Sequence, residues 1–129
     1  MIKLICLSLV LTITLLAGDI RKAGSLIGRI ESGGDVRLHG SLVGKIESDG
    51  GIRVNGSLVG RIESDGGIRK NGSLVGKVES DGGIRVNGSL AGKVERDGDV
   101  RKGGSIIGRV EGVPPAHAAI IFFWDFFTL

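Results

Sequence analysis

The residues of this sequence that could carry chemistry are mostly charged side chains that recur at a fixed interval. A glutamate and an arginine stand at the same two places of every 16-residue unit, as Glu63 and Arg53 do in the unit 50–65. If consecutive strands pair, Glu63 becomes a diagonal neighbour of Arg69, so the recurring charges can form a series of exposed ion pairs. Each such pair contributes only roughly 0.2–1 kcal/mol. The alternative interpretation is a comb of carboxylate and guanidinium groups that binds sugars or polymers.

The outward charges of the central units form the candidate interaction face. Its residues are Arg53, Arg61, Glu63, Arg69, Glu79 and Arg85. Positive and negative side chains alternate here without a basic block, and this argues against a nucleic-acid partner. The sequence does not name the partner, and an envelope protein, a glycan and self-association all stay open.

Other reactive residue types lack the companions that catalysis or metal binding needs. His39 and His117 stand alone, with no second ligand at metal-site spacing. The Ser-Asp-Gly-Gly turns resemble part of a calcium loop, but one aspartate per turn supplies too few oxygens for Ca²⁺. The glycines form no phosphate-binding signature between a strand and a helix. The sequence therefore predicts no enzyme, no cofactor and no metal site.

Self-similarity organises the chain from residue 18 onward. The six units begin at Gly18, Gly34, Gly50, Gly66, Gly82 and Gly98. Each unit contains two short strand candidates, 51–54 and 58–63 in the third unit, which alternate apolar and polar residues. A glycine every few residues would cost a helix roughly 1 kcal/mol each. The pattern predicts an all-β fold of six tandem 16-residue hairpin repeats.

The turn that joins one unit to the next predicts how the strands of consecutive units pair. A three-residue loop at 64–66 places Ile62 opposite Ile68, with Gly66 supplying the left-handed conformation that such loops require last. Asp65 suits the turn because its carboxylate can accept hydrogen bonds from nearby backbone N–H groups.

The second turn, at 55–57, is also interpreted as a three-residue loop. This register sets Val54 opposite Leu58 and Ile52 opposite Gly60, so that all of them share the inner face while Val59 points outward. Gly60 recurs in every unit at this mid-strand position, where it leaves space for a neighbouring side chain or a close backbone approach.

The N-terminus predicts export. Lys3 precedes an apolar stretch from Leu4 to Leu16, which has the length of a signal-peptide core and contains the only cysteine, Cys6. We therefore expect a signal peptide at 1–18, removed near Ala17–Asp19, and a mature domain at 19–129 in a secreted, periplasmic or cell-envelope location. An uncleaved first strand or a short membrane-associated segment is the alternative.

The C-terminal tail, 114–129, holds every aromatic residue of the chain. Left exposed, it would be an aggregation hazard, so we interpret it as a core strand that fills the space left by the small repeat residues. Membrane or partner contact is the alternative. The candidate core residues are Ile120, Ile121, Phe122, Phe123, Trp124, Phe126 and Phe127.

These residues resemble a known family. The segment Gly-Lys-Val-Glu-Ser-Asp-Gly-Gly-Ile-Arg at 76–85, iterated and ended by Gly-Arg-Val-Glu-Gly-Val-Pro at 108–114 and the Ala-Ala-Ile-Ile-Phe-Phe run at 118–123, is similar to the 4-fold beta flower domain. The family consists of small exported bacterial proteins of unknown function. The resemblance implies hairpin repeats around a common axis and brings no catalytic residues. Trp124-Asp125 interrupts the phenylalanine run, and six units leave the number of petals open.

A second resemblance leads to a different architecture. Recurring Gly-x-Leu-x-Gly-x-Ile beside Asp-Gly-x-Ile-Arg also resembles bactofilins, which are polymer-forming β-helical scaffolds. It implies a β-solenoid in place of hairpins. Two functions follow: an exported, non-enzymatic structural or interaction protein, or a bactofilin-like or amyloid-like self-assembling scaffold that polymerises through unpaired strand edges.

Overall fold

The computed structural model describes residues 17–129, and the leader predicted at 1–18 lies outside them except for its last two residues. Each 16-residue unit forms one β-hairpin, as predicted. The strands are β1 (Gly18–Lys22), β2 (Ser25–Ile30), β3 (Asp35–Leu38), β4 (Ser41–Ile46), β5 (Gly51–Val54), β6 (Ser57–Ile62), β7 (Gly67–Lys70), β8 (Ser73–Val78), β9 (Gly83–Val86), β10 (Ser89–Val94), β11 (Asp99–Lys102) and β12 (Ser105–Val110).

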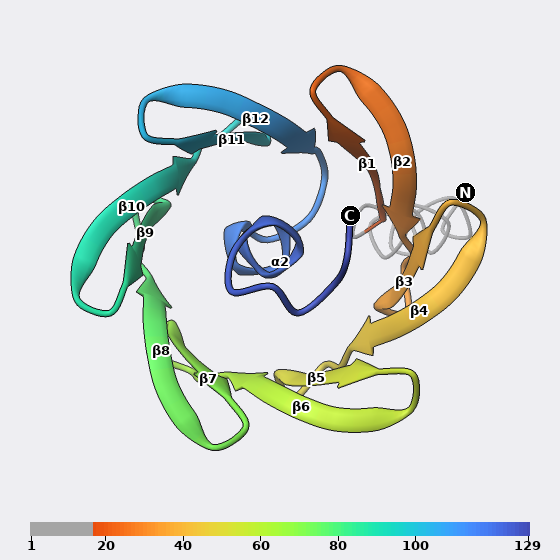
Figure 1. Cartoon of the computed structure of the whole chain (residues 1–129), viewed down its shortest axis with the longest axis horizontal. Coiled ribbons are helices and arrows are strands. Elements are labelled where there is room, and N and C mark those ends of the chain that lie inside the picture. The colour runs from red at the N-terminus through yellow and green to blue at the C-terminus, as the bar shows by residue number, and fades with distance from the viewer. Residues whose placement is uncertain (1–16) are drawn as a thin grey trace, which may run out of the picture.

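The twelve strands close into a barrel. Each of β2 to β11 pairs antiparallel with the strands before and after it in the chain, and β1 completes the ring by pairing antiparallel with β12. The hairpins stand around one axis, and the C-terminal helix occupies the centre (Figure 1). This is the predicted hairpin arrangement and not the solenoid alternative. Closure pairs both edges of every barrel strand, so the described barrel has no free strand edge at which a polymer could grow.

The turn between consecutive units has the predicted register. Ile62 lies opposite Ile68, and the Glu63 N–H donates to the Gly67 carbonyl at 2.7 Å. Gly66 has a φ of 93°, which an L-residue with a side chain rarely adopts. Asp65 Oδ1 accepts a hydrogen bond from the Gly67 N–H at 2.9 Å. Local turn chemistry therefore sets the junction between one hairpin and the next.

The turn within each hairpin differs from the prediction. Val54 lies opposite Ser57 and not Leu58, so the loop has two residues, with positive φ at Asn55 (50°) and Gly56 (85°). This turn matches the right-handed twist of the strands. A bulge at Val59 then restores the register so that Ile52 still faces Gly60.

The bulge reverses two predicted orientations. Leu58 lies opposite Arg53 and is exposed, although the three-residue loop would have placed it inside. Val59 was predicted to point outward and instead packs, half-buried, against the core. The extra residue of a bulge turns one strand relative to its partner, so side-chain alternation does not continue through it.

The same turn supplies a stability prediction. Ala23 has a φ of 50° at the place where Asn55, Asn71 and Asn87 stand in other hairpins. A left-handed conformation costs an ordinary L-residue roughly 1–2 kcal/mol, and asparagine tolerates it better. We therefore expect Ala23→Asn to raise the free energy of unfolding by about 1 kcal/mol, measured by urea denaturation. Asn71→Ala is the reciprocal control, and a gain in stability from that change would contradict the explanation.

The tail is a core element, as predicted, but it is not a strand. Residues Pro115–Phe122 form helix α2, which begins with proline at its first position and lies inside the barrel. All barrel strands are already paired on both sides, so an extended segment in the bore would leave its backbone N–H and C=O groups without partners. A helix satisfies these groups within the segment itself.

The core consists of the inner barrel positions and the tail. Ile20, Ile52, Ile68 and Ile84 are fully buried on the barrel wall, and Ile120 is fully buried on the helix. Within residues 17–129, no polar or charged residue belongs to the buried class. The core is therefore a layer of β-branched side chains around an apolar helix.

Candidate interaction surface and the filled bore

The aromatic side chains of the tail each lie against a mid-strand glycine of a different hairpin. A methyl group added at Gly60 would lie 2.6 Å from the Phe126 ring, and one added at Gly76 would lie 2.6 Å from Trp124. The tail meets successive hairpins in reverse order. The pairs are Phe122 with Gly108, Phe123 with Gly92, Trp124 with Gly76, Phe126 with Gly60 and Phe127 with Gly44.

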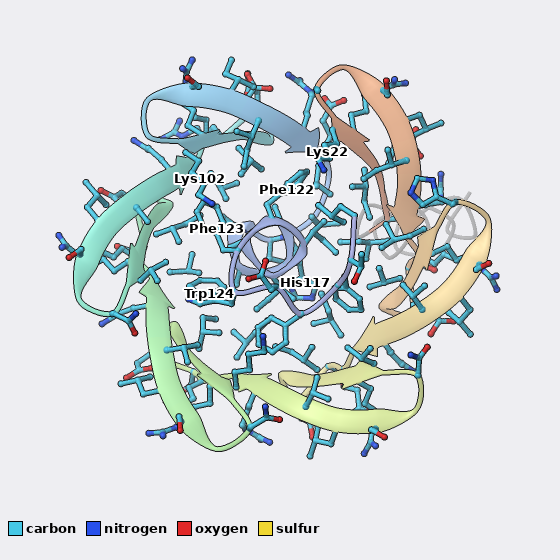
Figure 2. The ribbon with its side chains drawn as sticks, in the orientation of Figure 1. Lys22, Lys102, His117, Phe122, Phe123 and Trp124 are labelled. Carbon is cyan, nitrogen blue, oxygen red and sulfur yellow. The ribbon has the colours of Figure 1, made fainter. Side chains whose placement is uncertain are left out.

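Figure 2 shows Phe122, Phe123 and Trp124 spreading from the centre of the ring toward neighbouring hairpins. The predicted core residues Ile120, Ile121, Phe123, Phe126 and Phe127 are buried. Phe122 and Trp124 are half-buried and pack against the same core. The glycines therefore provide the predicted space for a neighbour, and that neighbour is an aromatic ring of the tail.

A lysine on the inner wall helps to hold the tail in place. Lys70 Nζ donates to the Trp124 carbonyl at 2.6 Å and to the Asp125 carbonyl at 3.3 Å. It also lies 5.3 Å from the centre of the Phe126 ring, within cation–π range. The Trp124 Nε1–H donates to the Val75 carbonyl at 3.1 Å. The sequence analysis assigned this lysine no role, because its partners lie 54 to 56 residues away in the tail.

His117 occupies the opposite end of the bore, where the chain enters it. The imidazole lines a hollow of about 280 Å³ together with Pro114, Glu31 and Glu47. Its Nδ1 is buried without a hydrogen-bond partner among the described residues. Burial lowers the pKa of His117 below its ordinary value of 6.5 because the charged imidazolium loses hydration.

This burial predicts an acid-sensitive barrel. The unfolded chain takes up a proton at His117 near pH 6.5, before the folded chain does. Stability should therefore be fully present above that pH and fall as the pH drops from it toward the lower folded-state pKa. Urea midpoints at pH 7.5 and pH 5.5 test this. His117→Gln should remove most of the difference, whereas His39→Asn, at an exposed turn, should leave it unchanged. An equal difference in the His117 variant would contradict the assignment.

The outer wall carries the predicted ion pairs. Arg69 Nε lies 2.8 Å from Glu63 Oε2, and the Arg69 Nη1–H also donates to the Gly72 carbonyl at 3.3 Å. Five junctions between units repeat the pair: Arg37–Glu31, Arg53–Glu47, Arg69–Glu63, Arg85–Glu79 and Arg101–Glu95. At the sixth junction Glu111 pairs with Arg109 at 3.0 Å. The carboxylates of Glu111 and then Asp99 raise the pKa of Arg109.

The predicted interaction-face residues divide into two kinds. Arg53, Arg69 and Arg85 each bond to a glutamate, so the structure joins them with Glu63 and Glu79 in the paired series. Arg61 is exposed and, within residues 17–129, has no carboxylate within ion-pair distance.

A belt of exposed apolar side chains was not foreseen. One residue per hairpin is 51–64% exposed on the outer wall: Leu26, Leu42, Leu58, Leu74, Leu90 and Ile106. We call these six residues the leucine belt. The alternation of the strand suggested inward side chains, and only recognition of the bulge at Val59 could have revealed the belt.

Three carboxylates at the β10–β11 turn come close together. Oxygens of Glu95, Asp97 and Asp99 lie within 4.8 Å of one another. Arg101 Nε lies 2.7 Å from Glu95, and Arg109 Nη1 lies 2.7 Å from Asp99. These guanidinium groups balance much of the negative charge, so the cluster belongs to the ion-pair series.

No helix among residues 17–129 combines the length and apolar character needed to cross a membrane. Comparison of the chain with family models, curated proteins and solved structures finds no match.

Proposed function

We propose that this protein is an exported, non-enzymatic module that binds a glycan or protein of the cell envelope through the outer wall of its barrel. The observation that carries the proposal is the leucine belt. It repeats one large exposed apolar side chain on each of the six hairpins, and an apolar surface repeated in this way can serve as a contact surface. Each residue of the leucine belt lies in a hairpin that also presents exposed charged groups, so one hairpin offers both apolar and charged contacts.

The filled bore supports an outer binding surface. The helix and the aromatic rings occupy the space in which a barrel of this kind could hold a small molecule. The hollows that remain at the two ends are open and lined partly by exposed turns. Binding by the outer wall therefore agrees better with this architecture than binding inside the barrel.

We also propose that the chain is related to the 4-fold beta flower family. The hairpins around one axis agree with what the resemblance implies. The six hairpins differ from the fourfold arrangement in the family name. Export also belongs to the proposal, and the leader predicted at 1–18 is the feature that supports it.

Cell fractionation and envelope binding test the proposal. We expect processed protein in the envelope or the medium, and purified mature protein should co-sediment with envelopes of the producing organism. Replacing Leu58, Leu74 and Leu90 by serine should weaken co-sedimentation without lowering the melting temperature, because these side chains are exposed. Serine-to-alanine changes at Ser57, Ser73 and Ser89 serve as the control. Full-length protein confined to the cytosol, or equal binding by the leucine variant, would overturn the proposal.

A further inference from the structure

All side-chain amides of this protein lie in the turns within three consecutive hairpins. The chain contains three asparagines and no glutamine, and each asparagine is followed by glycine. The three turns are Asn55-Gly56, Asn71-Gly72 and Asn87-Gly88. These six residues are exposed, and a methyl group added at any of the three glycines would meet no atom within 4 Å. We call these two-residue turns the amide turns.

An asparagine followed by glycine can change chemically without an enzyme. The backbone nitrogen of the glycine loses its proton and bonds to the asparagine Cγ, the Cγ–Nδ2 bond breaks, and ammonia leaves with that proton. Water then opens the five-membered imide. Opening at Cγ gives aspartate, and opening at the backbone carbonyl gives isoaspartate, in which the main chain passes through Cβ and Cγ. Glycine favours the ring because it has no side chain to hinder the approach of its nitrogen.

The attacking nitrogen is free in the amide turns. Within residues 17–129, no backbone hydrogen bond engages the N–H of Gly56, Gly72 or Gly88. The neighbouring hairpin instead accepts from the N–H of the asparagine itself, as Val43 does from Asn55 at 3.0 Å. The ring therefore forms without breaking a hydrogen bond of the glycine.

The turns between units contain the comparable dipeptide Asp-Gly, at 49–50, 65–66, 81–82 and 97–98, but hold it in place. The Gly66 N–H donates to the Glu63 carbonyl at 2.9 Å, and Asp65 Oδ1 accepts from the Gly67 N–H at 2.9 Å. The same two hydrogen bonds recur at the other three Asp-Gly turns. Both the nitrogen that would attack and the carboxyl group that it would attack are therefore engaged.

We propose that the amide turns are sites of spontaneous deamidation to isoaspartate and aspartate, while the Asp-Gly turns stay unchanged. Each conversion adds one negative charge at the exposed end of a hairpin, β5–β6, β7–β8 or β9–β10 (Figure 1). At the first of these turns the Arg53 Nη1–H donates to the Gly56 carbonyl at 3.3 Å, so the new carboxylate arises next to a residue that binds a guanidinium. Isoaspartate also adds a main-chain atom to a turn whose two residues match the twist of the strands, and this weakens the hairpin.

Ammonia release from the purified chain of residues 19–129 at mildly alkaline pH tests the proposal. The asparagines are the only side-chain amides of the chain, so ammonia reports on the amide turns alone. We expect one equivalent for each asparagine, isoaspartate in the peptides of the amide turns, and a lower urea midpoint for the aged chain than for the fresh chain. The triple variant Asn55→His, Asn71→His, Asn87→His copies the left-handed turn at His39 and should release no ammonia.

Two single variants test whether hydrogen bonding decides the reactivity. Ala23→Asn creates an Asn-Gly bond in a turn within a hairpin, and Asp65→Asn creates one in a turn between units. Among the described residues, no backbone hydrogen bond engages the Gly24 N–H, whereas the Gly66 N–H is bonded to Glu63. Ala23→Asn should release one further equivalent of ammonia at the rate of the natural sites. Asp65→Asn should release it at least about tenfold more slowly, because two hydrogen bonds must break first.

A sample denatured in guanidinium chloride gives the rate of the same chain without its fold. If the folded chain releases no ammonia over the time in which the denatured chain releases all of it, the proposal is overturned. Equal rates for Ala23→Asn and Asp65→Asn, or isoaspartate found mainly in the Asp-Gly turns, would also overturn it. Envelope binding through the leucine belt does not depend on deamidation, so the two proposals fail separately.

Discussion

A chain that ends after Val113 should lose cooperative unfolding or aggregate. The truncation removes the helix and all five aromatic side chains from the bore, leaving the inner wall and its mid-strand glycines facing empty space. Burial of each large apolar side chain contributes roughly 1.5–3 kcal/mol. Several such losses together match or exceed the whole net stability of a typical domain, about 5–15 kcal/mol.

Thermal unfolding followed by circular dichroism, together with gel filtration, measures this effect. A chain that ends after Phe127 is the matched control, because it lacks only exposed Thr128 and half-buried Leu129. We expect this control to melt cooperatively close to the chain of residues 19–129. If the chain ending at Val113 also stays monomeric and melts like the chain of residues 19–129, the tail does not hold the barrel together.

Gly60→Ala should lower the free energy of unfolding by about 2 kcal/mol or more. Its added methyl group would lie 2.5 Å from the Arg69 carbonyl oxygen and 2.6 Å from the Phe126 ring. The carbonyl belongs to a paired neighbouring strand and the ring is buried, so neither moves without disturbing the barrel. Overpacking of this kind typically costs 1–3 kcal/mol.

Urea denaturation of Gly60→Ala beside Gly33→Ala tests the explanation. Gly33 lies in a turn without positive φ, and a methyl group there would meet no atom within 4 Å. The second variant should therefore differ from the parent by a few tenths of a kcal/mol. A double variant with Phe126→Leu should recover part of the loss at Gly60, because a smaller side chain relieves one of the two contacts. Equal effects at Gly60 and Gly33 would contradict the close packing of the tail.

Local patterns in the sequence were sufficient to predict much of the architecture. The period of the units predicted the hairpins, and Asp65-Gly66 predicted the loop that sets Ile62 opposite Ile68. The recurring charges predicted the pairing of Arg69 with Glu63. These features depend on turn chemistry and on neighbouring strands, so the information lies within a few residues. The apolar composition of the tail, beside the small residues of the repeats, predicted that the tail belongs to the core.

The tertiary structure decided the features that depend on distant segments. The bulge at Val59 turned Leu58 outward, whereas a regular alternation of inward and outward side chains predicts that it points inward. Closure of β1 on β12 surrounded the tail with strands that had no free edge, and this favoured a helix over the predicted strand. The match of Phe126 to Gly60, 66 residues apart in numbering, arises only when the tail lies in the bore. The backbone hydrogen bonds of the barrel and the packing of the tail depend on the whole ring of hairpins. They therefore cannot be predicted from a single repeat.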